Sequence, residues 1–305
     1  MKKILLLLVL PMFMFAEYLY VGSSTQDGST DGDIKIENIS KTLSTSLKVG
    51  NTNVYQDIPI YVKTDSTKEV VLNISNIADL KNGSNEQIST FLSWIDGSGS
   101  ETFITDGNNF TILSRGSGNR DGTTIEGYIR VKIPSVASDQ TNGTYTFSDT
   151  IKTGLKDVLV TYSNDASFGF SADVALVAVA SFSDTSGYTQ GQKFVAGSVD
   201  FGTFSFDKNV IEKDLYIKSN STDSYKITFE NTPELVCETD SSQKIAMTYY
   251  FEGSQITAGS AFTPLNGKSD GTTSLGKLKF ETESITGSKL AGNYRATVNI
   301  SVTLE

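Results

Sequence analysis

Along this chain, apolar and polar residues alternate in short stretches that are separated by residues typical of turns. Residues 298–305 read VNISVTLE and alternate without a break, so their four apolar side chains would face a core and their four polar ones water. Residues 225–229 alternate in the same way. No segment of useful length shows the 3.6-residue period of an amphipathic helix. The pattern predicts an all-β protein built from β-sandwiches.

Several stretches occur twice at nearly constant spacing. The matching pairs are residues 121–124 with 270–273, both DGTT, residues 143–145 with 292–294, and residues 61–67 with 216–222. The first two pairs lie 149 positions apart and the third 155, because the stretch after Ser98 is longer in the first copy. One register interrupted at a single loop predicts a duplication, whereas two unrelated sandwiches with similar turns are the alternative. The predicted domains are residues 17–165 and 172–305, joined by residues 164–169.

The first residues have the layout of a secretory signal peptide. Lys2 and Lys3 precede an apolar run that ends near Ala16, which is too short for a membrane anchor. We therefore expect residues 1–16 to be removed and the rest of the chain to be exported. The net charge of -10 argues against a nucleic-acid partner.

The composition also limits the chemistry. The chain has no histidine, which removes the commonest general base and the commonest transition-metal ligand. Cys237 is the only cysteine, so no intramolecular disulfide can form. Residues 27–34 begin like a calcium loop, but Asn38 stands where the bidentate glutamate belongs, which favours a solvated turn. No catalytic residue, metal site or cofactor is predicted. A hydrolase with paired carboxylates such as Asp96 and Asp106 is the less favoured alternative.

The second copy resembles subunits of non-classical chaperone-usher fimbriae. Residues 231–235, NTPEL, and residues 291–305 resemble colonisation-factor pilins, and the whole copy is similar to spore coat U-type pilin domains, although the disulfide common in the latter is absent. The resemblance implies two tandem immunoglobulin-like sandwiches, the second lacking its last strand and completed by a strand from another fimbrial subunit. It also implies a periplasmic chaperone, an outer-membrane usher and export through the periplasm to a fimbrium on the cell surface.

An open strand edge needs a partner, because an exposed edge is an aggregation hazard. Residues Val298, Ile300, Val302 and Leu304 are predicted to line the edge of this polymerisation groove. The first copy has additional residues after Tyr145. A hairpin strand at residues 157–162 would let the first domain close itself, and a bulged long strand is the alternative.

That asymmetry favours a tip adhesin, with a self-contained receptor-binding domain mounted on a pilin domain. Residues 17–22 are short for a donor extension, which also favours the tip over a tandem structural pilin. A complete, monomeric cell-surface binding protein is a further alternative. The sequence does not name the receptor.

Two more stretches are candidates for a functional role. The run from Val174 to Ala180 is apolar on both faces, and its residues Val174, Leu176, Val177 and Val179 are expected at the domain junction. This run would be the first strand of the second domain or, less favoured, a donor strand for the first. In the loop 99–120, Phe103, Ile104 and Leu113 are candidate ligand-binding residues, whereas Phe110, Ile112 and Trp94 are expected in the core.

Overall fold

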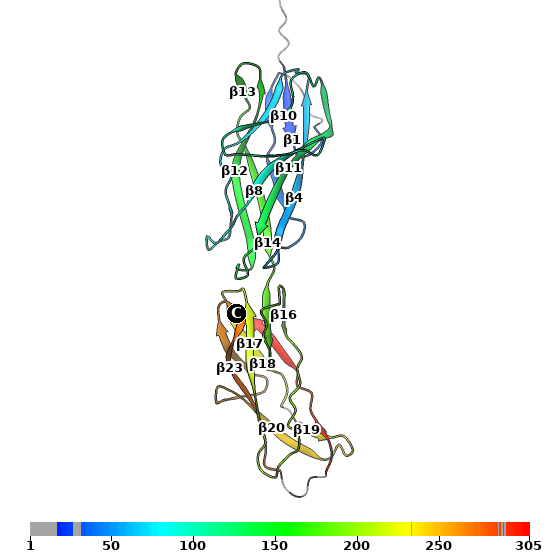
Figure 1. Ribbon diagram of the computed structural model, residues 1–305, viewed down its shortest axis with the longest axis vertical. Helices are drawn as coiled ribbons and strands as arrows, with labels where there is room; N and C mark the ends of the chain where they lie inside the picture. The colour runs from blue at the N-terminus through cyan, green and yellow to red at the C-terminus, as the bar shows by residue number, and fades with distance from the viewer. Residues whose placement is uncertain (1–16, 27–31, 233, 286, 288, 290) are drawn as a thin grey trace, which may run out of the picture.

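A computed structural model of the chain describes residues 17–26, 32–232, 234–285, 287, 289 and 291–305. The expected signal peptide and the first five residues of the calcium-like loop lie outside the described residues. The described residues form β-strands and no helix, which confirms the all-β prediction. Two sandwich domains lie end to end along the long axis of the molecule (Figure 1).

The first domain contains two sheets that enclose one core. One sheet has the order β2 (Ile34–Ile36), β1 (Leu19–Gly22), β4 (Thr52–Thr64), β11 (Arg120–Ser135), β8 (Phe91–Asp96) and β9 (Glu101–Phe103). The other has the order β10 (Asn109–Leu113), β5 (Glu69–Ile74), β12 (Gly143–Lys156), β14 (Ala166–Val174) and β3 (Ile39–Thr42). Short strands β13 (Val160–Tyr162) and β6 (Leu80–Lys81) also pair with β12, and β7 (Gln87–Ile88) pairs with β6.

The second domain has a larger and a smaller sheet. The larger has the order β16 (Gly191–Phe194), β15 (Val177–Ser181), β17 (Val210–Ser219), β23 (Ser269–Thr282), β20 (Lys244–Phe251), β19 (Glu234–Cys237) and β24 (Tyr294–Arg295), and β21 (Ser254–Ile256) pairs with β20. The smaller has the order β22 (Ala261–Asn266), β18 (Ser224–Phe229) and β25 (Ile300–Leu304).

The two domains pair their strands in matching registers. In the first domain Val70 of β5 faces Leu155 of β12, and in the second Tyr225 of β18 faces Leu304 of β25. Tyr225 lies 155 positions after Val70, and Leu304 lies 149 positions after Leu155, which are the two offsets found between the copies in the sequence. Strand β25 therefore occupies in the second domain the place that the end of β12 occupies in the first.

The boundary between the domains lies later in the chain than the sequence suggested. Residues 166–174, which include four of the six residues of the expected linker, form β14 and pair along β12 from Ile151 to Gly143. The first domain therefore ends at Val174, and β15 begins the second at Val177. The linker prediction was wrong because Ser167 and Gly169 occupy outward positions of a strand whose alternate residues Phe168 and Phe170 fill the core.

Each DGTT sequence makes a tight turn inside a long strand. Asp270 Oδ1 accepts hydrogen bonds from the backbone N–H and the hydroxyl of Thr272, at 2.9 and 2.8 Å. Gly271 has a φ of +80°, and a Cβ there would lie 2.2 Å from Thr185 Oγ1. Asp121 and Gly122 repeat this arrangement in the first domain, where φ is +83°. The glycine is required both by its backbone conformation and by the close approach of another segment.

Changing Gly271 to alanine should destabilise the second domain strongly. The left-handed conformation costs an L-residue roughly 1–2 kcal/mol, and the clash with Thr185 adds to it. The matched control is Gly253→Ala, since Gly253 has a φ of +79° but nothing within 4 Å of the added Cβ. Thermal unfolding of the two variants checks the difference, and equal losses would show that the close approach is unimportant.

Candidate strand-acceptor site

The sheet of the first domain that contains β12 is completed by a strand from the same domain. Strand β12 pairs with β5 on one edge and with β14 on the other, and β14 in turn pairs in parallel with β3. Ile151 and Leu155, which point inward from β12, are 0% and 4% exposed. The chain reaches β14 through a hairpin in which β13 pairs with the end of β12, so the hairpin alternative is the one observed.

The equivalent edge in the second domain is open. Strand β25 pairs with β18, and none of the described residues forms a strand on its other edge. Its inward-pointing residues Ile300, Val302 and Leu304 are all partly exposed, and so is Val298 just before the strand. All four pack against the second core from this edge, so the structure brings together the residues that the sequence assigned to the groove.

The far side of this opening is formed by β16 and the segment after it. Gln192 Nε2 donates a hydrogen bond to the carbonyl oxygen of Val302 at 3.0 Å. Residues 195–209 form no strand, although Phe201 and Phe204 stack on each other at 5.6 Å and pack on the core. In the first domain, the strand that follows β2 is β3, which pairs with β14. We call the open edge of β25, which Gln192 of β16 contacts, the acceptor slot.

The core around the acceptor slot is incomplete. Among the described residues, the first core cluster has 34 buried hydrophobic residues and eight partly buried ones around them, of which Val177, Val179, Tyr188 and Val195 come from the second domain. The second has 14 buried and 16 partly buried. Apolar side chains that remain partly exposed around an open strand edge are what a missing strand would leave. The sequence analysis assigned neither Gln192 nor residues 195–204 to this site. The only signal in that segment is that the apolar residues Val199 and Phe201 stand at alternate positions, as they would in an edge strand.

The apolar run from Val174 to Ala180 divides between the domains. Val174 is the last residue of β14 in the first domain, whereas Val177 and Val179 lie in β15, which pairs with β17 of the second. Leu176 lies between the two strands and packs partly on the second core. The run is thus the first strand of the second domain from Val177 onward, and the strand that completes the first domain is the one that precedes it.

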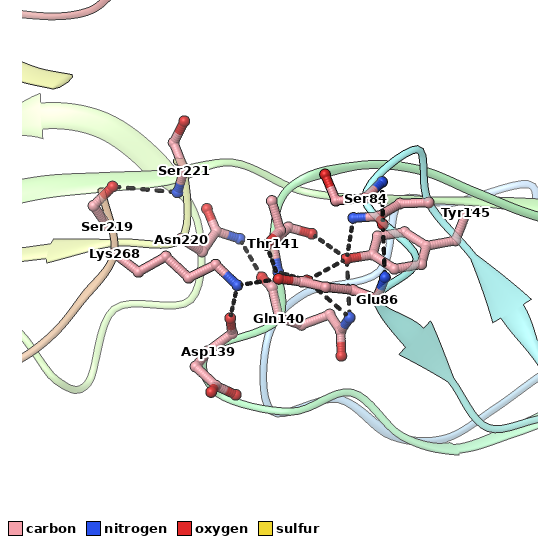
Figure 2. Close-up of polar contacts among 11 residues, drawn as sticks. Ser84, Glu86, Asp139, Gln140, Thr141, Tyr145, Ser219, Asn220, Ser221 and Lys268 are labelled. Carbon is pink, nitrogen blue, oxygen red and sulfur yellow. Dashed lines mark hydrogen bonds and ion pairs between the residues drawn. The ribbon is translucent and has the colours of Figure 1, made fainter. Parts of the chain in front are cut away.

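Asn220 holds the chain at the domain junction. Its side-chain oxygen accepts a hydrogen bond from the N–H of Val177 at 2.8 Å, and its amide nitrogen donates to the carbonyls of Ala175 and Gln140 at 3.0 and 3.1 Å. The residue is 1% exposed. One buried amide therefore connects the linker, the second domain and the loop before β12. Figure 2 shows its contact with Gln140.

A second connection at the junction is an ion pair between Lys268 of the second domain and Glu86 of the first (Figure 2). Lys268 Nζ also donates to the carbonyl of Asp139 at 3.1 Å. Burial alone would raise the pKa of Glu86, but hydrogen bonds from Lys268, Thr141 and Tyr145 outweigh it and lower this pKa to about 2. Glu86 is consequently a carboxylate at neutral pH, and its charge pairs with Lys268 across the domain junction.

The end of the first domain away from the junction carries exposed apolar residues. Val158 and Leu159, in the turn between β12 and β13, are 90% and 83% exposed (Figure 1). Among the described residues they are the most exposed of the large hydrophobic side chains. A hairpin at this position was one of the two alternatives predicted from the sequence, but no role was predicted for the apolar residues of its turn. We call these two residues the tip pair.

Of the three candidate ligand-binding residues, only Phe103 is accessible, with 69% of its surface exposed. The expectation for Ile104 and Leu113 was wrong, because both are 7% exposed and belong to the first core. Leu113 lies on β10, which pairs with β5 and turns the side chain inward. Trp94, Phe110 and Ile112 are buried in the same core, as expected.

The carboxylates proposed for a hydrolase serve local structure. Asp96 Oδ1 accepts hydrogen bonds from the N–H groups of Ser98 and Ser100, both at 2.9 Å, and Asp106 Oδ1 accepts from the N–H of Ile77 at 2.6 Å. Within the described part of the chain, no cluster of three metal-binding side chains occurs. A search of the same residues finds no helix long and apolar enough to span a membrane.

No protein-family model and no curated protein matches the sequence. Similar solved structures include a chain of the CsuC–CsuE chaperone–tip adhesion subunit complex of archaic Csu pili from Acinetobacter baumannii, with 14% identity and a TM-score of 0.46 over 87% of this chain and 98% of that one. The CupB6 tip adhesin of Pseudomonas aeruginosa has 11% identity and a TM-score of 0.39 over 85% and 89%. The CooA pilin subunit of enterotoxigenic Escherichia coli has 17% and 0.32 over 52% and 98%. With all three TM-scores below 0.5, these similarities carry no conclusion about what this chain does.

The ion pair at the junction predicts a specific loss of stability in acid. Because folding lowers the pKa of Glu86 from 4.5 to about 2, its contribution is complete above pH 4.5 and is lost as the pH falls toward 2. The difference in melting temperature between the unchanged chain and Glu86→Gln should therefore be largest above pH 5 and vanish near pH 2. Glu234→Gln, which breaks an exposed ion pair with Lys244, is the control and should have little effect throughout. A difference for Glu86→Gln that does not change with pH would contradict the role of its charge.

Proposed function

We propose that this chain is a fimbrial subunit, in which the second domain receives a strand from another subunit and the first mediates attachment. The observation that carries the proposal is the acceptor slot. In the first domain, the corresponding edge of β12 is covered, by β13 from Gly154 onward and by β14 from Ile151 back to Gly143, and β14 also pairs with β3. A strand pairing with the open edge of β25 would complete the second sandwich.

Strand β14 indicates what an incoming strand must provide. Phe168, Phe170, Ala172 and Val174 alternate along it and are all at most 3% exposed. A donor for the second domain therefore needs alternating apolar side chains with polar residues between them. The first domain cannot readily supply its own N-terminal strand to a neighbour, because Leu19 and Val21 are fully buried in its core. This favours a position at the tip of the fimbrium over one in the shaft.

Attachment would use the end of the first domain that lies opposite the junction. The tip pair projects from the turn between β12 and β13, and exposed apolar residues mark interaction surfaces. A rigid junction places this surface at the far end of the molecule from the acceptor slot (Figure 1). The proposal contains no catalytic step.

Before a donor strand fills the acceptor slot, another protein would have to cover its open edge. An open sheet edge with partly exposed apolar residues is prone to self-association, so a periplasmic chaperone would protect it during export. An outer-membrane usher and other fimbrial subunits are the further partners, and the surface of the cell is the location. The receptor, biological or abiotic, is the remaining partner of the first domain.

A donor strand supplied in the same chain tests the acceptor slot. The variant carries a copy of residues 166–174 after Glu305, joined by a glycine-serine linker of about eight residues that spans the return along the strand. We expect the melting transition of the second domain to rise by roughly 4–8 °C for each kcal/mol gained, and the amides of β25 to become protected from hydrogen exchange.

The control extension has serine in place of the copies of Phe168 and Phe170, which should remove the gain because the core would stay unfilled. If neither extension stabilises the second domain or protects β25, the slot is not an acceptor, and a complete monomeric binding protein becomes the better description.

Replacing both Val158 and Leu159 with serine should reduce attachment to an apolar surface without loss of stability. Both side chains are almost fully exposed, so the effect on unfolding should stay within about 0.5 kcal/mol. Retention of protein-coated beads on polystyrene under flow measures the change. The matched control is Val210→Ser, since Val210 is 49% exposed and lies in the second domain. Equal retention of all three proteins would rule out the tip pair as the attachment surface.

A further inference from the structure

The open edge of the second domain extends beyond β25 toward the preceding strand. At the offset of 149, residues 292–300 correspond to the part of β12 that pairs with β14 in the first domain. The two segments are also held alike on their other side, since Arg295 pairs with Val236 as Thr146 pairs with Lys81. A strand that completes the second domain as β14 completes the first would therefore lie along residues 292–300.

This segment is interrupted in the second domain. Strand β12 is continuous, whereas residues 296–299 separate β24 from β25 and form no strand. Asn231 holds one side of the interruption, because its side chain donates a hydrogen bond to the carbonyl of Thr297 at 3.0 Å and accepts one from the N–H of Asn299 at 2.9 Å.

The other side of the interruption has unpaired backbone groups. Within the described residues, no hydrogen bond reaches the backbone of Ala296 or Val298. Val302, at an even position of the same alternation, directs its carbonyl away from β18 and toward Gln192. The backbone groups of Ala296 and Val298 therefore point to the open side, where an added strand would pair with them.

The corresponding segments of the two domains differ in side-chain volume at one inward position. Phe147 of β12 is 6% exposed, and its ring centroid lies 5.7 and 6.1 Å from those of Phe168 and Phe170 on β14. Its counterpart in the second domain is Ala296, which is exposed. The residues two positions to either side of Ala296 pack on the second core, so Ala296 occupies an inward position of the alternation.

A donor residue opposite Ala296 would consequently have to fill more space than its counterpart in the first domain. Phe170 is the cross-strand partner of Phe147, and such partners on one face lie about 4.5–5.5 Å apart. With alanine on the acceptor side, a small donor residue would leave a cavity, which is strongly destabilising in a core. An aromatic donor residue would fill it beside Tyr294, whose ring meets that of Phe204 edge to face at 6.3 Å.

We propose that Ala296 selects donor strands that carry an aromatic residue at the position opposite it. The inference rests on the proposed function and specifies the partner: a fimbrial subunit whose extended strand has this aromatic residue and apolar residues two positions to either side. By pairing with the backbone of Ala296 and Val298, the same strand would join β24 to β25, as β12 is continuous beside β14.

The test combines two appended strands with two acceptors in the exported chain. One strand is the copy of residues 166–174 after Glu305, with the same glycine-serine linker, and the other has alanine in place of the copy of Phe170. The acceptors are the unchanged second domain and Ala296→Phe, each compared with the same protein without a strand. On the unchanged domain, the alanine strand should give a melting temperature about 8 °C or more below that of the aromatic strand. On Ala296→Phe this difference should fall to less than half, because the acceptor then supplies a ring.

Thr297→Phe is the matched control, since it adds the same ring one position away on the outward face. It should leave the difference between the two strands unchanged. Hydrogen exchange gives an independent measurement of the pairing. The amides of Ala296 and Val298 should become protected with the aromatic strand, whereas that of Asn299, which already donates to Asn231, should change little.

The inference is overturned if the two strands stabilise the unchanged domain equally, or if Ala296→Phe reduces their difference no more than Thr297→Phe does. Both results leave the acceptor slot intact, because the appended strands still stabilise the second domain. If neither strand raises the melting temperature or protects β25, the acceptor slot itself is rejected, and selection by Ala296 is rejected with it.

Discussion

The pairing of β12 with β14 is the interaction on which the organisation of this protein depends. It satisfies the backbone hydrogen bonds of β12 along one edge, from Gly143 to Ile151, and brings Phe168 and Phe170 into the first core. Where it is present, the inward residues of the last strand are buried. Where its equivalent is absent, beside β25, the corresponding residues remain partly exposed. The difference between a self-contained and an unfinished domain thus comes from one strand.

The same strand also determines how the domains are connected. Because β14 ends at Val174 and β15 begins at Val177, only two residues separate the two sandwiches. Asn220 satisfies the backbone groups of this short connection, and Lys268 and Glu86 join the loops on either side of it (Figure 2). A short connection with buried polar contacts favours a fixed arrangement of the two domains, which the proposed function would use.

Much of the fold could be predicted from local pattern. The alternation of residues 298–305 located the open strand, and the spacing of the DGTT and Gly-x-Tyr stretches located equivalent positions in the two domains. The prediction failed where alternating residues were mixed with Ser and Gly, as in residues 166–174. There the strand is specified by its partner β12, and its composition is typical of a loop. Ile104 and Leu113 were misplaced for a related reason, since their loop contains the strands β9 and β10.

The sequence by itself determined the all-β class, the two matching units and the apolar residues of the last strand, because these depend on periodicity and spacing within the chain. Only the tertiary structure decided which strand completes the first domain, that Gln192 contacts β25, and which side chains meet at the junction. Those contacts join residues such as Glu86 and Lys268, which are 182 positions apart. A local pattern records the environment that each residue prefers, but it carries no information about which distant residue provides that environment.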